Sequence, residues 1–437
     1  MRRAARKFIR GTLALAAAVC VGTPVAGAQA TPDSVPAALP AALHDSLVIS
    51  VITMGPGDEV FERFGHQSIR IHDITTGLDS AYNWGMFDFD QPHFIARFLS
   101  GDTRYWMQGY PTLPLVAYYS NKLHRSVWEQ ELNLTSFEKD SLWHYIQWNA
   151  KEENKWYRYD YYRDNCATKV RDILNMVLKG SIERAVATHE HGVSYRSETL
   201  RLARAYPLIN IGMDFVLGRP ADDTLSAWAE MFVPMRLQQL IRSIRVRHSD
   251  GTVTRLVRRE RQLVSDDTYK DGDTPPGYFS PALEVGLFIT GVLLALCMLP
   301  GASAPVRWTV GAIAIVWNLL AGFVGILLLY ADIFTRHAQY MGRNVNVLLA
   351  TPAALALVVL IPMALRASAS PKVVRAMRAL SVFAAVCAVI AVLLRVVPHL
   401  AQQNRPLLAL IVPVQAALAF ALWRVTIRNT ERSGDSV

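Results

Sequence analysis

The sequence predicts an α+β domain followed by an all-α transmembrane bundle of about five helices. Three observations support this fold class: a basic, apolar leader, a middle part in which short β-branched runs alternate with amphipathic stretches, and five apolar stretches near the C-terminus. The 437 residues are 51% hydrophobic, which excludes a disordered chain. We expect a signal peptide at 1–30, an exported domain at 31–278 and a transmembrane domain at 279–437.

The first 30 residues have the composition of an export signal. Five basic residues precede an apolar run from Gly11 to Gly22, and Ala28-Gln29-Ala30 resembles a cleavage site. A permanent N-terminal anchor is the alternative interpretation.

The net charge of +9 is distributed unevenly. Residues 31–278 carry 28 basic and 32 acidic residues, whereas residues 279–437 carry 12 basic and 4 acidic residues. The basic excess therefore lies in the leader and the apolar part, and the exported part is slightly acidic. This distribution argues against a nucleic-acid partner.

The middle part contains strand and helix signals in a mixed order. The β-branched run at 48–54 and the alternating stretches at 67–72 and 80–87 predict strands. A short helix is expected at 92–99, and a capping box at 135–138 predicts the start of a longer one. Apolar residues at helical spacing predict a further helix over 166–179, with Gly180 as its stop.

Five C-terminal stretches are long and apolar enough to cross a bilayer of ~30 Å hydrocarbon thickness. They lie near 281–299, 306–330, 345–365, 378–397 and 406–424. If the middle part is exported, eight basic residues fall on the cytoplasmic side and four on the outer side. This asymmetry agrees with the positive-inside rule, so we expect a multi-pass membrane protein.

Cys166 is the one cysteine of the exported part, because the others are Cys20, Cys297 and Cys387. A lone thiol in an oxidising compartment is either buried and inert or used in chemistry. Asn165 is a good N-cap for the predicted helix, which places Cys166 in its first turn. Unsatisfied N–H groups and the helix dipole there favour a thiolate and a lowered pKa. We therefore interpret Cys166 as a nucleophile.

His66 is the candidate base for this thiol. It follows Gly65 at the start of a predicted strand, where glycine leaves room for a substrate. His72 shares the same strand face but lies ~20 Å further along an unbroken strand, so it is not expected to serve the same thiol. A structural role for His66 is the alternative. The sequence holds no HExxH, CxxC or GxSxG motif and no phosphate-binding glycine loop, so no metal or other cofactor is predicted.

Five short motifs occur in a fixed order along the exported part. They are FGHQSIR at 64–70, YNWGMFDF at 82–89, DNCAT at 164–168 with RD at 171–172, YR at 195–196, and a glycine- and aspartate-containing run at 212–218. Over about residues 50–240 this set resembles the N-terminal periplasmic domain of the Lnb-type bacterial lipoprotein N-acyltransferases. The order of histidine before an Asn-Cys helix start also resembles that of circularly permuted papain-like folds.

The resemblance implies a thiol-dependent acyltransferase in the bacterial inner (cytoplasmic) membrane, with 31–278 on its periplasmic or outer side. His66 would activate Cys166, which would take an acyl chain from a phospholipid and pass it to the N-terminal amine of a lipoprotein. By the logic of catalytic triads, we expect Asn83 to orient His66, with a strand-edge or turn contact as the alternative. Asn165 is expected to act as the helix cap.

Two short stretches that follow the second span, THR at 335–337 and NVNVLL at 344–349, resemble the outer loop of that family's membrane part. Within them, His337, Asn344 and Asn346 are predicted to contact lipid headgroups or the lipidated peptide, or else to cap helices. Two other functions remain open. An envelope cysteine peptidase or amidase would use the same Cys–His pair but would need only one anchor. A non-catalytic membrane assembly factor would not need to retain both His66 and Cys166.

Overall fold

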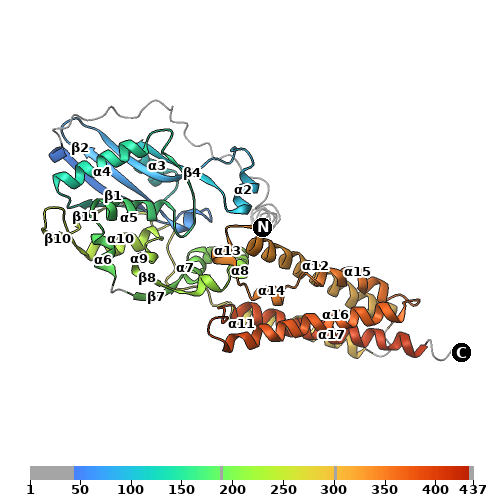
Figure 1. Cartoon of the computed structure of the whole chain (residues 1–437). Helices are drawn as coiled ribbons and strands as arrows, with labels where there is room; N and C mark the ends of the chain where they lie inside the picture. Colours follow the sequence, from blue (N-terminus) through green and yellow to red (C-terminus); the bar gives the residue numbers. More distant parts are fainter. Residues whose placement is uncertain (1–43, 188–189, 300–302, 433–437) are drawn as a thin grey trace. The chain divides into compact units, whose positions relative to one another are not determined.

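The computed structural model describes residues 44–187, 190–299 and 303–432 and divides into two compact units (Figure 1). The first unit contains the residues up to Ile209 together with Thr224–Thr274. The second contains Asn210–Asp223 and the residues from Pro275 onward. The expected signal peptide lies outside the described residues.

An antiparallel sheet of seven strands forms the centre of the first unit, in the order β11-β5-β1-β2-β3-β4-β6. Its strands are β1 (Leu47–Met54), β2 (His66–Asp73), β3 (Asp79–Met86), β4 (Arg104–Pro111), β5 (Val127–Leu132), β6 (Trp156–Arg158) and β11 (Val257–Val264). The strands expected at 48–54, 67–72 and 80–87 are β1, β2 and β3. Two smaller antiparallel pairs join β7 (Glu190–Ser194) to β8 (Thr224–Ser226) and β9 (Arg245–Arg247) to β10 (Val253–Arg255).

Alternate residues of β1 face two different apolar clusters, which explains its nearly continuous hydrophobic sequence. Leu47, Ile49 and Val51 belong to the main core. Ile52 and Met54 point to the other face and pack in a smaller cluster. The sheet is therefore covered on both faces near its centre.

The main core is filled by helices that follow the predicted capping and periodicity signals. The helices of this unit are α2 (Phe94–Ser100), α3 (Thr112–Asn121), α4 (Ser136–Asn149), α5 (Cys166–Val177), α6 (Ser181–Val186), α7 (Tyr195–Leu202), α9 (Ala227–Glu230) and α10 (Pro234–Ser243). Thr135 and Glu138 form the reciprocal capping box at the start of α4. Residues of α4, α5, α6 and α10 join the main core, whereas Leu115, Val116 and Tyr119 of α3 pack in the smaller cluster.

The second unit contains five helical spans long and apolar enough to cross a membrane, as the sequence predicts. They are α11 (Phe279–Met298), α12 (Ala304–Phe334), the stretch Asn346–Ala364, the stretch Pro371–Val396 and α17 (Arg405–Arg432). The third span is broken into α14 (Asn346–Leu349) and α15 (Ala354–Ala364), with Pro352 between them, and the fourth consists of α16 (Pro371–Leu393) and η5 (Leu394–Val396). The last helix continues through Pro413.

Close helix packing and one inserted segment hold the second unit together. Gly325 of α12 lies against the carbonyl oxygen of Ala350, and a Cβ at this position would overlap that oxygen. The segment 210–223 carries most of α8 (Pro207–Val216) and η4 (Arg219–Asp222), and it belongs to this unit. Between α12 and α14 lies the short helix α13 (Ala338–Met341). The predicted class, a mixed domain followed by five apolar helices, is thus confirmed.

Candidate functional site

The first turn of α5 carries Cys166, and Asn165 fixes where this helix begins. The Asn165 Oδ1 atom accepts a hydrogen bond of 2.9 Å from the backbone N–H of Thr168, while the Thr168 hydroxyl accepts one of 2.7 Å from the backbone N–H of Asn165. The Asn165 Nδ2 atom donates to the carbonyl oxygens of Tyr161 and Phe232, at 2.8 and 2.9 Å. The hydrogen bonds of this side-chain amide therefore fix the residue at which helix α5 starts.

The sulfur of Cys166 lies at the start of strand β2. Backbone N–H groups near the sulfur, that of Gln67 foremost and those of Ala167 and Cys166 itself as well, act to lower its pKa. Gln67 directly follows His66, so the strand end that supplies the imidazole also contacts the thiol. On the neighbouring strand, Gly85 has a φ of 94°, a conformation that favours glycine, and a Cβ there would lie 3.8 Å from that of Cys166.

His66 is held by Asn83 from the adjacent strand β3. The Nε2 atom of His66 lies 3.1 Å from Oδ1 of Asn83, and the Asn83 Nδ2 atom donates to the carbonyl of Ala81 at 2.9 Å. Because the amide nitrogen is bound elsewhere, its oxygen accepts from the ring, which assigns the proton to Nε2 in the neutral imidazole. The Nδ1 atom is then the basic one. Asn83 is 2% exposed, so this contact is protected from water.

Two residues near His66, Tyr119 and Arg125, carry no local sequence signal. The ring of His66 stacks on that of Tyr119, with centroids 6.4 Å apart, and the Arg125 guanidinium lies 4.9 Å from the Tyr119 centroid. Arg125 is 3% exposed, donates to the Gly55 carbonyl at 2.7 Å and forms an ion pair of 3.6 Å with Glu62. Tyr119 lies on α3 and Arg125 just before β5, so their position depends on the packing of α3 and on the pairing of β1 with β5, which no short motif encodes.

Burial keeps both His66 and Cys166 uncharged. It lowers the pKa of His66 to about 4, with the charge of Arg125 adding to the effect and the Asn83 hydrogen bond opposing it. Burial also raises the pKa of the Cys166 thiol, although the surrounding N–H groups and Arg125 act in the other direction. The expected net lowering of this thiol pKa was wrong, because loss of hydration outweighs the helix N-terminus. The resting site holds a neutral thiol and a neutral imidazole.

Two tyrosines, Tyr157 and Tyr159, lie close to Gly85, which itself lies beside Cys166. A Cβ on Gly85 would lie 3.8 Å from Tyr159 and 3.9 Å from the Tyr157 hydroxyl oxygen. Among the described residues, none forms a hydrogen bond with this buried hydroxyl. Burial raises the pKa of Tyr157 well above its ordinary value, so the group stays a protonated donor next to the site.

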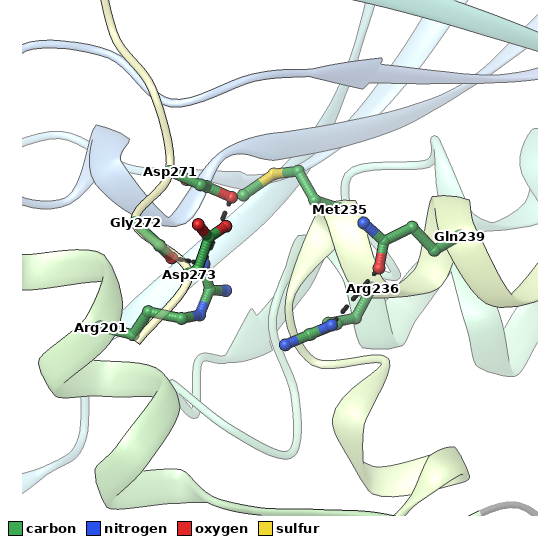
Figure 2. Close-up of a pocket in the computed structure, with 7 residues that line it drawn as sticks. All are labelled: Arg201, Met235, Arg236, Gln239, Asp271, Gly272 and Asp273. Carbon is green, nitrogen blue, oxygen red and sulfur yellow. Dashed lines mark hydrogen bonds and ion pairs between the residues drawn. The ribbon is translucent and has the colours of Figure 1, made fainter. Parts of the chain in front are cut away.

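Figure 2 shows a cavity of the first unit that has Met235 in its lining. A Cβ on Gly65 would touch the sulfur of Met235, and the cavity has a volume of about 200 Å³. It is lined by Arg201, Met235, Arg236, Gln239, Asp271, Gly272 and Asp273. Arg201 pairs with Glu198 and Asp271, and Arg236 pairs with Glu198, so two carboxylates face these two guanidinium groups within the protein. The lining contains no thiol or imidazole.

The outer-loop residues expected to touch substrate lie in the second unit. His337 directly precedes α13 and is half-buried, and its backbone N–H donates to the Thr335 hydroxyl at 3.1 Å. Asn344 and Asn346 lie together and are buried, with their side-chain nitrogens donating to the Phe215 carbonyl at 3.0 and 2.8 Å. The two asparagines thus hold the inserted segment 210–223, a structural use of their amides. Contact with substrate stays a prediction for all three residues.

Fold and composition together define a membrane protein in which a mixed α/β domain precedes five long apolar helices. Residues 40–202 match the family model described as the Lnb N-terminal periplasmic domain. The chain therefore has an Lnb N-terminal periplasmic domain, and His66, Asn83, Asn165 and Cys166 all lie within the matched residues. The match ends in α7, before the apolar helices. No curated protein and no solved structure matches the chain.

Proposed function

We propose that this protein is a membrane-bound cysteine acyltransferase that moves an acyl chain from a phospholipid to the N-terminal amine of a lipoprotein. The observation that carries the proposal is the meeting of Cys166, at a helix start, with the strand end that bears His66, within a domain that matches the Lnb model. The imidazole already has a hydrogen-bonded amide partner in Asn83. A helix-borne thiol preceded in the chain by a strand-borne histidine also supports a circularly permuted papain-like arrangement.

In the first half-reaction, the Nδ1 atom of His66 takes the thiol proton while the sulfur attacks the ester carbonyl carbon. This order suits a pair that is neutral at rest, because charge develops only as the C–S bond forms. The resulting oxyanion is bound by backbone N–H groups at the start of α5 and by the hydroxyl of Tyr157. The imidazolium then protonates the leaving oxygen of the lysophospholipid, the C–O bond breaks, and a thioester remains on Cys166.

In the second half-reaction, the α-amino group of a lipoprotein's N-terminal cysteine attacks the thioester. His66 now takes a proton from the amine and returns it to the sulfur as the C–S bond breaks. The products are an amide and the free thiol, so no oxidant, metal or other cofactor enters the balance. Asn83 holds the imidazole in one tautomer through both steps.

Membrane attachment fits this chemistry because both substrates are lipids. A chain with five spans stays in the bilayer that holds its donor and acceptor, which raises their effective concentration. We propose the inner membrane as its location, with the Lnb domain on the periplasmic side.

The decisive experiment follows the acyl group. The full chain is incubated in vesicles with a phospholipid whose chains are isotopically labelled, and peptides containing Cys166 are analysed by mass spectrometry. We expect a hydroxylamine-sensitive acyl adduct on Cys166, absent from Cys166→Ala, that moves to a diacylglyceryl peptide on its addition. No adduct on Cys166 would refute the mechanism. Cleavage of a peptide bond without acyl transfer would favour the amidase.

A further inference from the structure

The short helix α2 exposes apolar side chains although it belongs to the first unit. None of its residues is buried. Ile95, Phe98 and Leu99 are 41%, 39% and 46% exposed, and the nearby Phe89 is 60% exposed. The ring of Phe94 lies next to those of Phe89 and Phe98, with centroids 5.1 and 6.3 Å apart, so these side chains form one apolar surface. Exposed contiguous apolar surfaces can mark binding sites.

A continuous strip of aromatic rings connects this surface to the thiol. The strip consists of Phe87, Phe94, Phe98, Tyr105, Tyr159 and Tyr161. Starting at the helix, the ring centroids of Phe98 and Tyr161 are 6.1 Å apart, and those of Tyr161 and Tyr159 are 5.7 Å apart. Tyr159 in turn lies beside Gly85, whose Cβ position is equally close to Cys166.

A second series of ring contacts also connects Tyr159 with helix α2. The Tyr159 and Tyr105 centroids are 4.2 Å apart, and those of Tyr105 and Phe87 are 5.0 Å apart. Phe87 stacks on Phe94 of α2 at 6.2 Å. Burial raises the pKa of Tyr105, Tyr159 and Tyr161, so the strip is uncharged at physiological pH.

We propose that α2 and the aromatic strip bind the hydrocarbon chain of a membrane phospholipid, with the ester carbonyl of that chain at Cys166. The inference rests on the proposed function for what happens at the thiol, but lipid binding itself does not require catalysis. Lipid is the favoured occupant for two reasons. The five apolar spans keep the protein in a bilayer, and the one charged side chain of α2, Arg97, is turned back to donate to the Asp102 carbonyl. Uncharged aromatic and aliphatic side chains suit an acyl chain.

The first test maps the lipid directly. Full-length Cys166→Ala protein is placed in phosphatidylethanolamine vesicles that contain a phospholipid with a diazirine in the middle of one acyl chain. After illumination, labelled peptides of the first unit are identified by mass spectrometry. We expect labelling of 87–99 and 159–161 at least five times that of two other exposed apolar residues of this unit, Phe137 and Met176, which are 59% and 52% exposed. Equal labelling would overturn the inference.

The second test uses matched double variants in the full chain. Ile95→Gln/Leu99→Gln should lower labelling of α2 at least fivefold and reduce acylation of Cys166 by a long-chain phospholipid about tenfold. Acylation by a short-chain soluble thioester should not change. Phe137→Gln/Met176→Gln should leave all three unchanged. If the α2 variant alters the oligomeric state in detergent and not the lipid labelling, the surface binds a second copy and the inference is wrong.

The outcomes separate this inference from the proposed function. Labelling of α2 without any acyl adduct on Cys166 in the wild-type protein would retain the lipid site and reject the acyltransferase. An acyl adduct whose rate does not depend on α2 would retain the acyltransferase and reject the site.

Discussion

The Nε2 atom of His66 lies 3.1 Å from Oδ1 of Asn83, across two adjacent antiparallel strands. The contact fixes the imidazole tautomer and leaves Nδ1 as the basic nitrogen. It also stabilises the imidazolium once His66 has taken the thiol proton, because hydrogen bonds to charged groups are the stronger ones.

Replacing Asn83 should therefore slow the reaction and change its pH dependence. A hydrogen bond to a charged group contributes about 1.5–3 kcal/mol, so Asn83→Ala should lower kcat by roughly 10- to 100-fold. Asn83→Asp should raise the pKa of His66 and move the acid limb of kcat/KM to higher pH. Asn133→Ala, which removes another side-chain hydrogen bond of this unit, is the control. An unchanged pH profile in Asn83→Asp would show that the contact does not influence the base.

The neutral state of the site predicts how Cys166 responds to pH. Since its thiol pKa is raised, alkylation by iodoacetamide should increase about tenfold per pH unit between pH 6 and 9, because only the thiolate reacts. Since the His66 pKa is lowered to about 4, the acid limb of acyl transfer should fall near pH 4 and not near 6.5. Stopped alkylation followed by mass spectrometry measures the first quantity. A plateau of alkylation between pH 5 and 8 would instead indicate a thiolate–imidazolium pair.

Much of the candidate site follows from sequence because it depends on local signals. The position of Cys166 follows from the Asn165 cap, and that of His66 from a strand whose pairing with β1 is unbroken. Arg125 and Tyr119 required knowledge of which strands pair, which is a long-range property. The direction of the thiol pKa shift was wrong for a related reason. The helix N-terminus can be read from local sequence, whereas the burial that raises the pKa depends on the whole fold.

The hydroxyl of Tyr157 offers a sharp test of oxyanion binding. Loss of one oxyanion donor typically lowers kcat by about 10²–10³-fold. We therefore expect Tyr157→Phe to lower kcat by about this factor or slightly less, with KM unchanged. Tyr82 is the matched control: its hydroxyl is also buried and without a partner among the described residues, but its side chain lies in the main core. Tyr82→Phe should show no measurable loss. Equal effects of the two variants on kcat would remove Tyr157 from the mechanism.

We expect Asn346 to contribute to the stability of the second unit, whether or not it contacts substrate. Its Nδ2 atom donates to the Phe215 carbonyl at 2.8 Å, and its Oδ1 accepts from Asn404 at 2.7 Å. Asn346→Leu would leave the buried Asn404 amide without this acceptor and would remove one of the two asparagine donors to the Phe215 carbonyl. The change should cost about 1–3 kcal/mol and lower the midpoint of thermal unfolding in detergent. Asn318→Leu is the control, because Asn318 donates only within its own helix. If the Asn318 variant is the less stable one, the asparagine cluster does not hold segment 210–223.

Segment 210–223 also determines how the first unit behaves when it is separated from the apolar helices. The acidic balance of 31–278 suggests a soluble domain after truncation near residue 278. However, Leu217 is 3% exposed, and its carbonyl accepts a hydrogen bond from Gln402 at 3.1 Å, within the second unit. A chain cut after Thr274 would retain the segment and lose these partners, so apolar residues such as Phe215 would become exposed. We expect this truncated protein to aggregate in size-exclusion chromatography, and a version with 210–223 replaced by a glycine–serine linker to be monomeric.

The linker version should also keep the pH dependence of Cys166 alkylation, since the thiol, imidazole and amide all belong to the first unit. A monomeric simple truncation would show that segment 210–223 does not depend on the apolar helices for burial.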